Sequence, residues 1–518
     1  MPHAVRETSG GRRISRRERA WFVAVGVVAV VLRVPAVFVG LPYLSHPDEP
    51  VNLAVARRMV AERSLNPRFF DYPSLAYDIQ AAAHAAYRLL GRLVGGGASN
   101  EVMVSANLGV AKALDPGAVL VARGVTFSIS LAIVAIVGWL AWLVSNDRRA
   151  VLVAAALAAV SAPLVEHAAL VTPDTLTAAT ATLAVCAALR LRHSGTAAAY
   201  LIAGAAVGLA AASKYNAAVV ALAVVAAHLM RVDRHHRRLV FAGLSAITAF
   251  LVTCPFVVLD HSTFLANLRS VLSHYSTGHD GYEGNSWAMN SWWLAIAFGP
   301  ILVLAVSPII REVRRRRSNS WRSLDDTTAI PVAVFVAASF VLVAAQQVRF
   351  ERNLLPLIPS LVALVAVGVR QLRDRLAVRA TFRRRALSGV LAVSVVWFVA
   401  VGVSASIEAA RDPVDETREW IAAYVPAGQV IVVDSYGPFL DADRWTLLHP
   451  RYALVETEVT FGATPDVVIV SRRGSGRYLD LADDKGARAT LAALVAAACA
   501  DISLDDDTVR VLVLRCDG

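Results

Sequence analysis

The stretch WFVAVGVVAVVLRVPAVFVGLPYLSHPDEP, residues 21–50, decides the class of this protein. It opens with a run of roughly 20 residues whose only charge is Arg33, long enough to cross a bilayer as a helix. Two carboxylates, Asp48 and Glu49, follow directly. A capping box from Ser45 to Asp48 would explain them, since acids suit the first turn of a helix. The alternative is a reaction centre at the membrane surface.

The composition of the chain is typical of a membrane protein. The 518 residues are 56% hydrophobic, with a mean hydropathy of +0.54. Several uncharged stretches are long enough to span a bilayer, which predicts a polytopic α-helical membrane protein. The net charge of +11 does not indicate nucleic-acid binding, because the arginines lie in short loops between apolar runs.

Hydropathy predicts about eleven spans. The basic segments GRRISRRERA, NDRR, RLRH, RVDRHHRR, REVRRRRSNSWRS and RQLRDRLAVRATFRRR then all fall on one side, which the positive-inside rule makes cytoplasmic. A missed or extra span would break this alternation. The predicted spans are 20–40, 119–144, 150–168, 173–190, 197–212, 215–230, 238–258, 290–310, 329–346, 353–370 and 386–407.

This count divides the chain into a cytoplasmic basic N-terminus (1–19), a transmembrane domain (20–407) and an extracytoplasmic C-terminal domain (408–518). The outer face also receives the long loop 41–118 and the polar loop 259–288. The inner loops are almost purely basic, whereas the outer loops are rich in His, Asp, Tyr and Asn. A site for polar chemistry therefore belongs on the outer face.

The first outer loop contains two predicted helices that lie in the membrane interface, residues 50–63 and 73–94. The alternative for 73–94 is a further span, which would invert the sidedness of every later basic loop. The segment GGGASN, residues 95–100, is typical of a flexible linker.

The tail predicts a small α/β domain, because strand-like and helix-like segments alternate. Four cysteines occur in the chain. Cys186 and Cys254 lie in apolar runs and are expected to pack as small hydrophobic residues. Cys499 and Cys516 lie in the tail, where a disulfide and two free thiols are both compatible with the sequence. The predicted strands are 429–437, 465–473 and 508–516, and the predicted helices are 414–425 and 489–500.

Three cations stand on the outer side, where positive charge is generally scarce. Arg349 and Arg352 lie in QQVRFERN at a span boundary, and Lys214 lies in a turn between two apolar runs. Charges so close to lipid are costly and usually mark a site, and arginines can hold a phosphate through paired hydrogen bonds. Snorkelling to the interface explains any one of them equally well.

Other polar residues are weaker candidates. Asp174 in VTPDT fits a helix start, with Thr172 as cap, better than catalysis. Arg33 and Arg123 lie in or near apolar runs and are candidates to support the site. A solvated loop is the favoured interpretation of the polar group around His279, with sugar or metal binding as the alternative. That group is His274, His279, Asp280, Tyr282 and Glu283.

The order of these motifs resembles the C-type membrane glycosyltransferases (GT-C fold) that use lipid-linked sugars, the family of the protein O-mannosyltransferases and the aminoarabinose transferase of lipid A. The resemblance covers most of residues 20–370, and the tail resembles the outer domain of some prokaryotic members. The segments that carry it are VVLRVPAVF, HPDEPVNLAVA, DYPSLAYDI, ARGVTFSIS, TPDTLTAATATLA, GLAAASKYNA, RNLLPLIPSL and REWIAAYVPAGQVIVVDSYGP.

The resemblance implies transfer of a sugar from a polyprenyl phosphate to a hydroxyl of a protein, lipid or glycan, with inversion. Asp48 would be the base, with Glu49 beside it, and Arg349, Arg352 and Lys214 would stabilise the phosphate. Tyr72, in DYPSLAYDI, is a supporting candidate. The resemblance leaves a divalent metal open as a cofactor, because relatives differ in whether one takes part.

Two other classes remain open. A polytopic transporter or flippase of a lipid-linked or anionic solute would also place charges in the membrane, but such proteins often show repeated halves. A non-catalytic scaffold presenting the outer domain leaves the placement of acids and cations unexplained.

Overall fold

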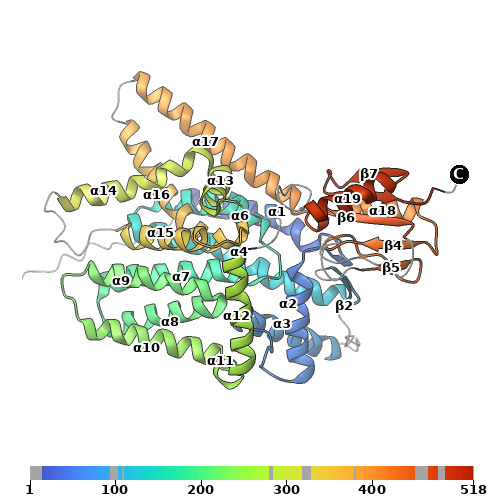
Figure 1. The fold of residues 1–518 in the computed structure, drawn as a ribbon. Helices are drawn as coiled ribbons and strands as arrows, with labels where there is room; N and C mark the ends of the chain where they lie inside the picture. The colour runs from blue at the N-terminus through green and yellow to red at the C-terminus, as the bar shows by residue number, and fades with distance from the viewer. Residues whose placement is uncertain are drawn as a thin grey trace, which may run out of the picture.

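A computed structural model describes residues 15–93, 103–107, 110–278, 284–317, 328–377, 381–449, 465–476 and 485–516. Helices form an elongated bundle, and a small domain with a five-stranded sheet lies at one end of it (Figure 1). The linker 95–100 and residues His279, Asp280, Tyr282 and Glu283 lie outside the described residues.

Every predicted span coincides with a helix. The described residues include six helices long and apolar enough to cross a membrane, and shorter apolar helices at 197–213, 215–229 and 330–344. The polytopic fold class is therefore confirmed. The helices of the bundle are α1 (Arg16–Phe38), α4 (Pro116–Ser145), α5 (Arg148–Val160), α6 (Ala162–Glu166), α7 (Pro173–Ser194), α8 (Ala197–Ser213), η1 (Tyr215–Val220), α9 (Ala221–Leu229), α10 (His236–Thr253), α11 (Phe256–Leu259), α12 (His261–Thr277), α13 (Ser286–Phe298), η2 (Gly299–Ala305), α14 (Val306–Arg317), α15 (Ile330–Ala344), η4 (Glu351–Leu357), α16 (Ile358–Ala377) and α17 (Thr381–Glu408).

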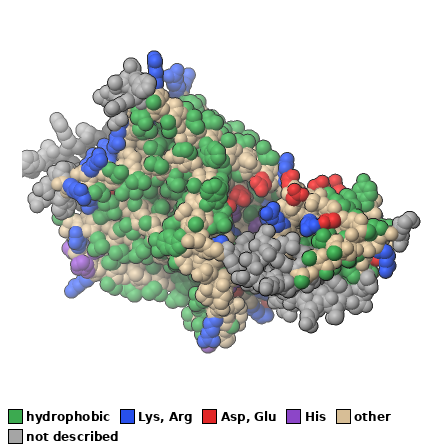
Figure 2. Space-filling model, turned by 45° about the horizontal axis from the view of Figure 1, so that its top comes forward, with side chains coloured by type: hydrophobic (Ala, Val, Ile, Leu, Met, Phe, Trp, Pro, Cys, Tyr) green, Lys and Arg blue, Asp and Glu red, His purple; other side chains and the backbone are tan. Residues whose placement is uncertain are grey.

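The surface of the bundle matches a membrane environment. Figure 2 shows apolar side chains covering the flank of the bundle, with Lys and Arg side chains gathered at the end away from the C-terminal domain. That end carries the basic loops that the sequence analysis assigns to the cytoplasm. Exposed Val393, Val396 and Trp397 on α17 illustrate the apolar flank.

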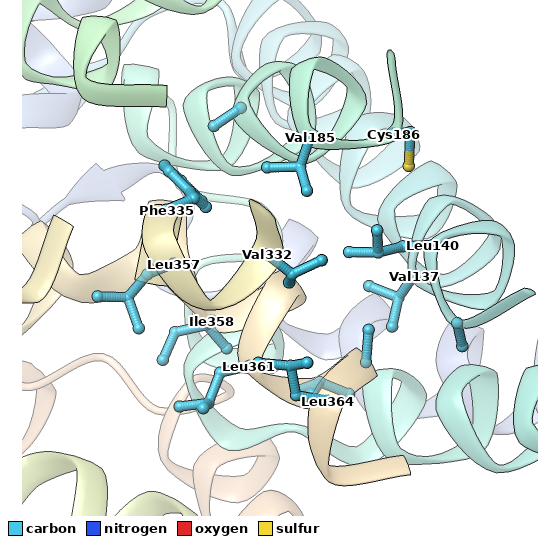
Figure 3. Close-up of a cluster of buried hydrophobic side chains, with 14 of the residues drawn as sticks. Val137, Leu140, Val185, Cys186, Val332, Phe335, Leu357, Ile358, Leu361 and Leu364 are labelled. Atoms are coloured by element: carbon cyan, nitrogen blue, oxygen red, sulfur yellow. The ribbon is translucent and has the colours of Figure 1, made fainter. Parts of the chain in front are cut away.

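The core of the bundle joins helices that are distant in sequence. Val137 of α4, Val185 of α7, Phe335 of α15 and Leu361 of α16 meet in one cluster (Figure 3). Close helix approach also needs small residues: a Cβ at Gly204 of α8 would lie 2.0 Å from the carbonyl oxygen of Ala242 on α10. These contacts hold the ends of α7, α8 and α16 in fixed relative positions.

Arg33 supports this scaffold from inside the bundle. Its fully buried guanidinium donates to the carbonyl oxygens of Ala158 (2.9 Å) and Ala159 (2.6 Å) in the last turn of α5, and to Ser130 Oγ (3.0 Å). A cation at a helix C-terminus complements both the unpaired carbonyl groups and the helix dipole. Arg33 thus ties α1 to α4 and α5.

The first outer loop folds over the end of the bundle nearest the C-terminal domain. It contains α2 (Asp48–Glu62), α3 (Leu75–Leu93) and an antiparallel sheet in the order β1-β3-β2. The two helices agree with the predicted interface helices. The sheet, which the sequence analysis did not predict, consists of β1 (Tyr43–Leu44), β2 (Met103–Asn107) and β3 (Val110–Ala113).

The C-terminal domain is a five-stranded sheet in the order β5-β4-β6-β8-β7 with one helix on each face. Side chains alternate between the faces: Ile431 packs with α18, and Val432 packs with α19. A Cys499–Cys516 disulfide joins β7 to the chain end after β8. The elements are α18 (Asp415–Tyr424), β4 (Val430–Val433), β5 (Thr446–Leu448), β6 (Val467–Ser471), α19 (Lys485–Ala497), β7 (Ala500–Leu504) and β8 (Val509–Val513).

Charged contacts attach this domain to the outer loop. Arg418 of α18 lies over the Tyr43 ring, 3.9 Å from its centroid, and pairs with Asp412 at 2.8 Å. Lys112 of β3 pairs with Asp441 at 2.6 Å. The domain is therefore held beside the segment that leads to Asp48.

Candidate active site

Asp48 is the first residue of α2, and Arg352 of η4 donates a hydrogen bond to its carboxylate through Nη1. The two residues are 304 positions apart in sequence and are both partly exposed. The capping-box alternative is wrong: Pro47 is the N-cap residue and makes no side-chain capping bond. Asp48 therefore faces a cation from the far half of the chain instead of its own helix backbone.

Glu49 has a different partner. Its two carboxylate oxygens accept hydrogen bonds from Arg123 Nε (2.8 Å) and Nη2 (2.7 Å), and both side chains are almost fully buried. Arg123 also donates to the carbonyl oxygens of Val37 (3.2 Å) and Val39 (2.7 Å), where α1 ends. This bidentate pair fixes the first turn of α2 against α1 and α4. We therefore assign Glu49 a positioning role.

Lys214 forms the centre of a second buried group. Its Nζ lies 2.7 Å from Asp174 Oδ1 and 3.1 Å from Asn353 Oδ1. Lys214 is the C-cap residue of α8, Asp174 lies in the first turn of α7, and Asn353 follows Arg352 in η4. The favoured capping interpretation of VTPDT is wrong in part, because Thr172 makes no side-chain capping bond and the Asp174 carboxylate pairs with Lys214.

Tyr72 lies near both groups, and His46 lies beside Asp48. The Tyr72 ring centroid lies 5.7 Å from Lys214 Nζ, and burial, reinforced by the charge of Asp48, raises the pKa of its hydroxyl well above 10. His46 Nδ1 accepts a hydrogen bond from the Asp48 backbone N–H at 3.3 Å. Burial lowers the pKa of His46 to about 4, so its ring is neutral at pH 7. The site thus combines paired charges with neutral hydrogen-bonding groups.

The last turn of α12 contributes His274 and Tyr275. Burial and the nearby Arg352 charge lower the pKa of His274, and Tyr275 interacts electrostatically with Tyr72. The sequence analysis left His274 in a solvated loop and did not select His46, Asn353 or Tyr275. Asn353 had a usable signal, because it directly follows Arg352 in QQVRFERN.

Three further candidates remain: Arg349, Arg33 and His279. Arg349 is buried, with Nη1 2.7 Å from where a Cβ on Gly284 would stand, just before α13. Arg33 caps α5 within the bundle. His279 lies outside the described residues.

The acidic side chains of the site form ion pairs with Arg or Lys. Among the described residues, no three His, Cys, Asp or Glu side chains converge as a metal site. Asp48 pairs with Arg352, Glu49 with Arg123 and Asp174 with Lys214. Each of these three carboxylates therefore has a cation as a partner.

A cavity of about 170 Å³ opens beside His46 and Glu49 toward the C-terminal domain. It continues into a wider groove of about 950 Å³, because Tyr43, Arg411 and Arg473 line both. A molecule from the aqueous side can therefore approach the first turn of α2 between the bundle and the C-terminal domain.

Comparison with known proteins agrees with this architecture. Residues 121–259 match the family described as dolichyl-phosphate-mannose-protein mannosyltransferase. No curated protein matches the chain in sequence. The oligosaccharyltransferase AglB from Archaeoglobus fulgidus, solved with an inhibitory peptide and a dolichol-phosphate, superposes with a TM-score of 0.53 at 12% identity. That superposition covers 80% of this chain and 62% of the archaeal enzyme, so this chain spans less than two thirds of its length.

Two further solved structures superpose more loosely. The S. cerevisiae protein O-mannosyltransferase Pmt1–Pmt2 complex, bound to the sugar donor, has a TM-score of 0.34 and 14% identity, covering 53% of this chain and 37% of that one. The mycobacterial arabinofuranosyltransferase AftD has a TM-score of 0.42 and 15% identity, covering 88% and 37%. The superposition on the archaeal oligosaccharyltransferase, with the family match in residues 121–259, confirms the expected resemblance: this chain has the C-type membrane glycosyltransferase fold.

Proposed function

We propose that this protein transfers a sugar from a polyprenyl phosphate to an acceptor hydroxyl at the extracytoplasmic face of the membrane, with inversion. The observation that carries the proposal is the contact between Asp48 and Arg352 beside the Lys214 group. A carboxylate able to accept a proton and a guanidinium able to bind phosphate are within one hydrogen bond of each other. Inverting transfer from a lipid phosphate needs both at once.

In the proposed reaction, the acceptor oxygen attacks the anomeric carbon while the bond from that carbon to the phosphate oxygen breaks. The electron pair of that bond leaves on the phosphate, and the hydroxyl proton passes to the Asp48 carboxylate. Phosphate is a good leaving group, so its departure requires cations more than a strong acid. Arg352 is placed to share its N–H donors between Asp48 and the phosphate, and Lys214 adds a second positive charge.

The donor and acceptor would approach from different directions. The lipid tail of the donor remains in the bilayer around the apolar flank of the bundle (Figure 2). The acceptor would enter through the groove beside Tyr43 and Arg473 and reach Asp48 past His46. The groove favours an acceptor with polar groups, because Glu408, Asp412 and Arg411 line it.

The direct test incubates the purified protein with a panel of polyprenyl-phosphate sugars and measures release of free polyprenyl phosphate. Asp48→Asn should reduce transfer by about 10²–10⁴-fold, the usual contribution of a general base, while donor binding persists. Asp78→Asn is the matched control: Asp78 lies in the first turn of α3, where burial raises its pKa to about 6, and this variant should transfer at the wild-type rate. Full activity in Asp48→Asn would refute the assignment of the base.

A transporter or flippase remains the rival from another class. It predicts that vesicles containing the protein move a lipid-linked or anionic solute without release of polyprenyl phosphate. Solute movement that persists in Asp48→Asn, with no transfer in either protein, would favour that rival.

A further inference from the structure

Two buried polar atoms of the site have no hydrogen-bond partner among the described residues: Asp174 Oδ2 and Asn353 Nδ2. Asp174 is 0% exposed and Asn353 is 2% exposed. Native proteins pair nearly all such atoms, so each exception calls for a reason. Here the two exceptions lie in side chains that bind the same lysine.

Lys214 determines how the two side chains are turned. An ammonium group only donates hydrogen bonds, so the amide of Asn353 must present its oxygen to Lys214 and direct its NH₂ group elsewhere. Asp174 likewise accepts a hydrogen bond from Lys214 through Oδ1, which leaves Oδ2 as an unused acceptor. The protein therefore offers one strong acceptor and one donor around a fixed cation.

The chemistry of this pair narrows the class of ligand. A phosphate oxygen would satisfy Asn353 Nδ2 but has no proton for Asp174 Oδ2. An ammonium group would satisfy Asp174 Oδ2 but has no acceptor for Asn353 Nδ2 and would lie beside Lys214. A hydroxyl group both donates and accepts hydrogen bonds, so hydroxyl groups can pair with both atoms.

The two side chains lie next to residues assigned to the proposed reaction, because both bind Lys214 and Asn353 directly follows Arg352. Asp174 interacts electrostatically with Arg352, which binds Asp48. The ring of Tyr72, 5.7 Å from Lys214 Nζ, adds an aromatic surface of the kind that packs against a sugar. The side chains that carry the two unpaired atoms thus lie beside Lys214, one of the cations proposed to bind the donor phosphate.

We propose that Asp174 and Asn353, aligned by Lys214, recognise a hydroxyl of the donor's glycosyl group and discriminate against the corresponding deoxy sugar. This inference rests on the proposed function. Asn353 is then a specificity-determining residue, because loss of the hydroxyl leaves its NH₂ and the Asp174 carboxylate buried without partners.

The experiment compares the parent donor with analogues that each lack one sugar hydroxyl, by kcat/KM for release of polyprenyl phosphate. Wild type should lose at least about tenfold with one analogue, as expected for a hydrogen bond to a charged group. Asn353→Ala should lose a comparable factor with the parent donor and discriminate much less against that analogue. Asn353→Ser, which keeps a shorter donor, should recover part of the discrimination.

Thr182→Val is the matched control, because Thr182 is fully buried two turns deeper in α7 and bonds only within that helix. Its discrimination should equal that of wild type. Equal rates with every deoxy analogue in wild type would overturn the inference, as would full discrimination in Asn353→Ala. If Asn353→Ala fails to fold, the inference is tested by the deoxy-analogue panel with wild type and with Asn353→Ser. Absence of release from any donor would instead refute the proposed function.

Discussion

The buried pair of Glu49 and Arg123 gives the sharpest test of how the site is built. Glu49→Gln keeps the shape of the side chain and removes its charge, leaving the Arg123 guanidinium buried beside a neutral amide. The pair is bidentate, at 2.8 and 2.7 Å, with side chains 1% and 4% exposed. Breaking a buried pair by removing one partner costs about 3–5 kcal/mol, and we expect this loss in the free energy of unfolding.

The assay is equilibrium unfolding by SDS in mixed micelles, followed through tryptophan fluorescence. Glu49→Gln/Arg123→Gln removes both charges, so its loss should be smaller than the sum of the two single losses by about 2 kcal/mol. Asp501→Asn provides the control, because its pair with Arg510 is about one-third exposed and should contribute less than about 1 kcal/mol.

The outcome separates a positioning role from a catalytic one. If Glu49 were the base, the folded fraction of Glu49→Gln would have lost transfer. If the reasoning above holds, Glu49→Gln is unstable, and its remaining folded fraction still transfers sugar. Unfolding free energies within about 1 kcal/mol of wild type, or strictly additive single and double losses, would refute the assigned role.

Three further outcomes are expected. Arg352→Ala should weaken donor binding by about 10–100-fold, the value of a hydrogen bond to a charged group, with a smaller effect on the acceptor KM; unchanged donor affinity in both Arg352→Ala and Arg349→Ala would contradict the phosphate role. Replacing Cys499 and Cys516 by serine should cost about 3 kcal/mol, because the disulfide spans 17 residues; an unchanged thermal midpoint, with or without reductant, would count against a stabilising disulfide. His46 has a folded pKa of about 4, below its unfolded value of about 6.5. The unfolded chain therefore binds more protons between these values, so stability should fall as pH drops from 6.5 to 4, and His46→Gln should show a shallower pH slope of the thermal midpoint.

The sequence by itself determined the class of the protein and the positions of its apolar helices, whereas α12 (His261–Thr277) lies where a polar loop was expected. A span must be long and apolar to satisfy its backbone in lipid, so the eleven helical regions can be read from hydropathy alone. The strands 430–433, 467–471 and 509–513 were predicted for a related reason, since each is a short β-branched run. The strands 446–448 and 500–504, and the sheet β1-β3-β2, lack that signal and were missed.

Only the tertiary structure decided which charges meet. The sequence placed Asp48, Arg352, Lys214 and Asp174 on one face of the membrane, but it could not assign partners across 304 residues. Pairing depends on how helices pack side by side, and close approaches such as Gly204 against Ala242 determine that packing. For the same reason the sequence correctly predicted that Asp174 lies in the first turn of a helix, but it could not show that its carboxylate pairs with Lys214 or that Glu49 pairs with Arg123. The local pattern of hydropathy determines where a helix lies along the chain. The packing between distant helices determines which charged side chains at the helix ends become partners.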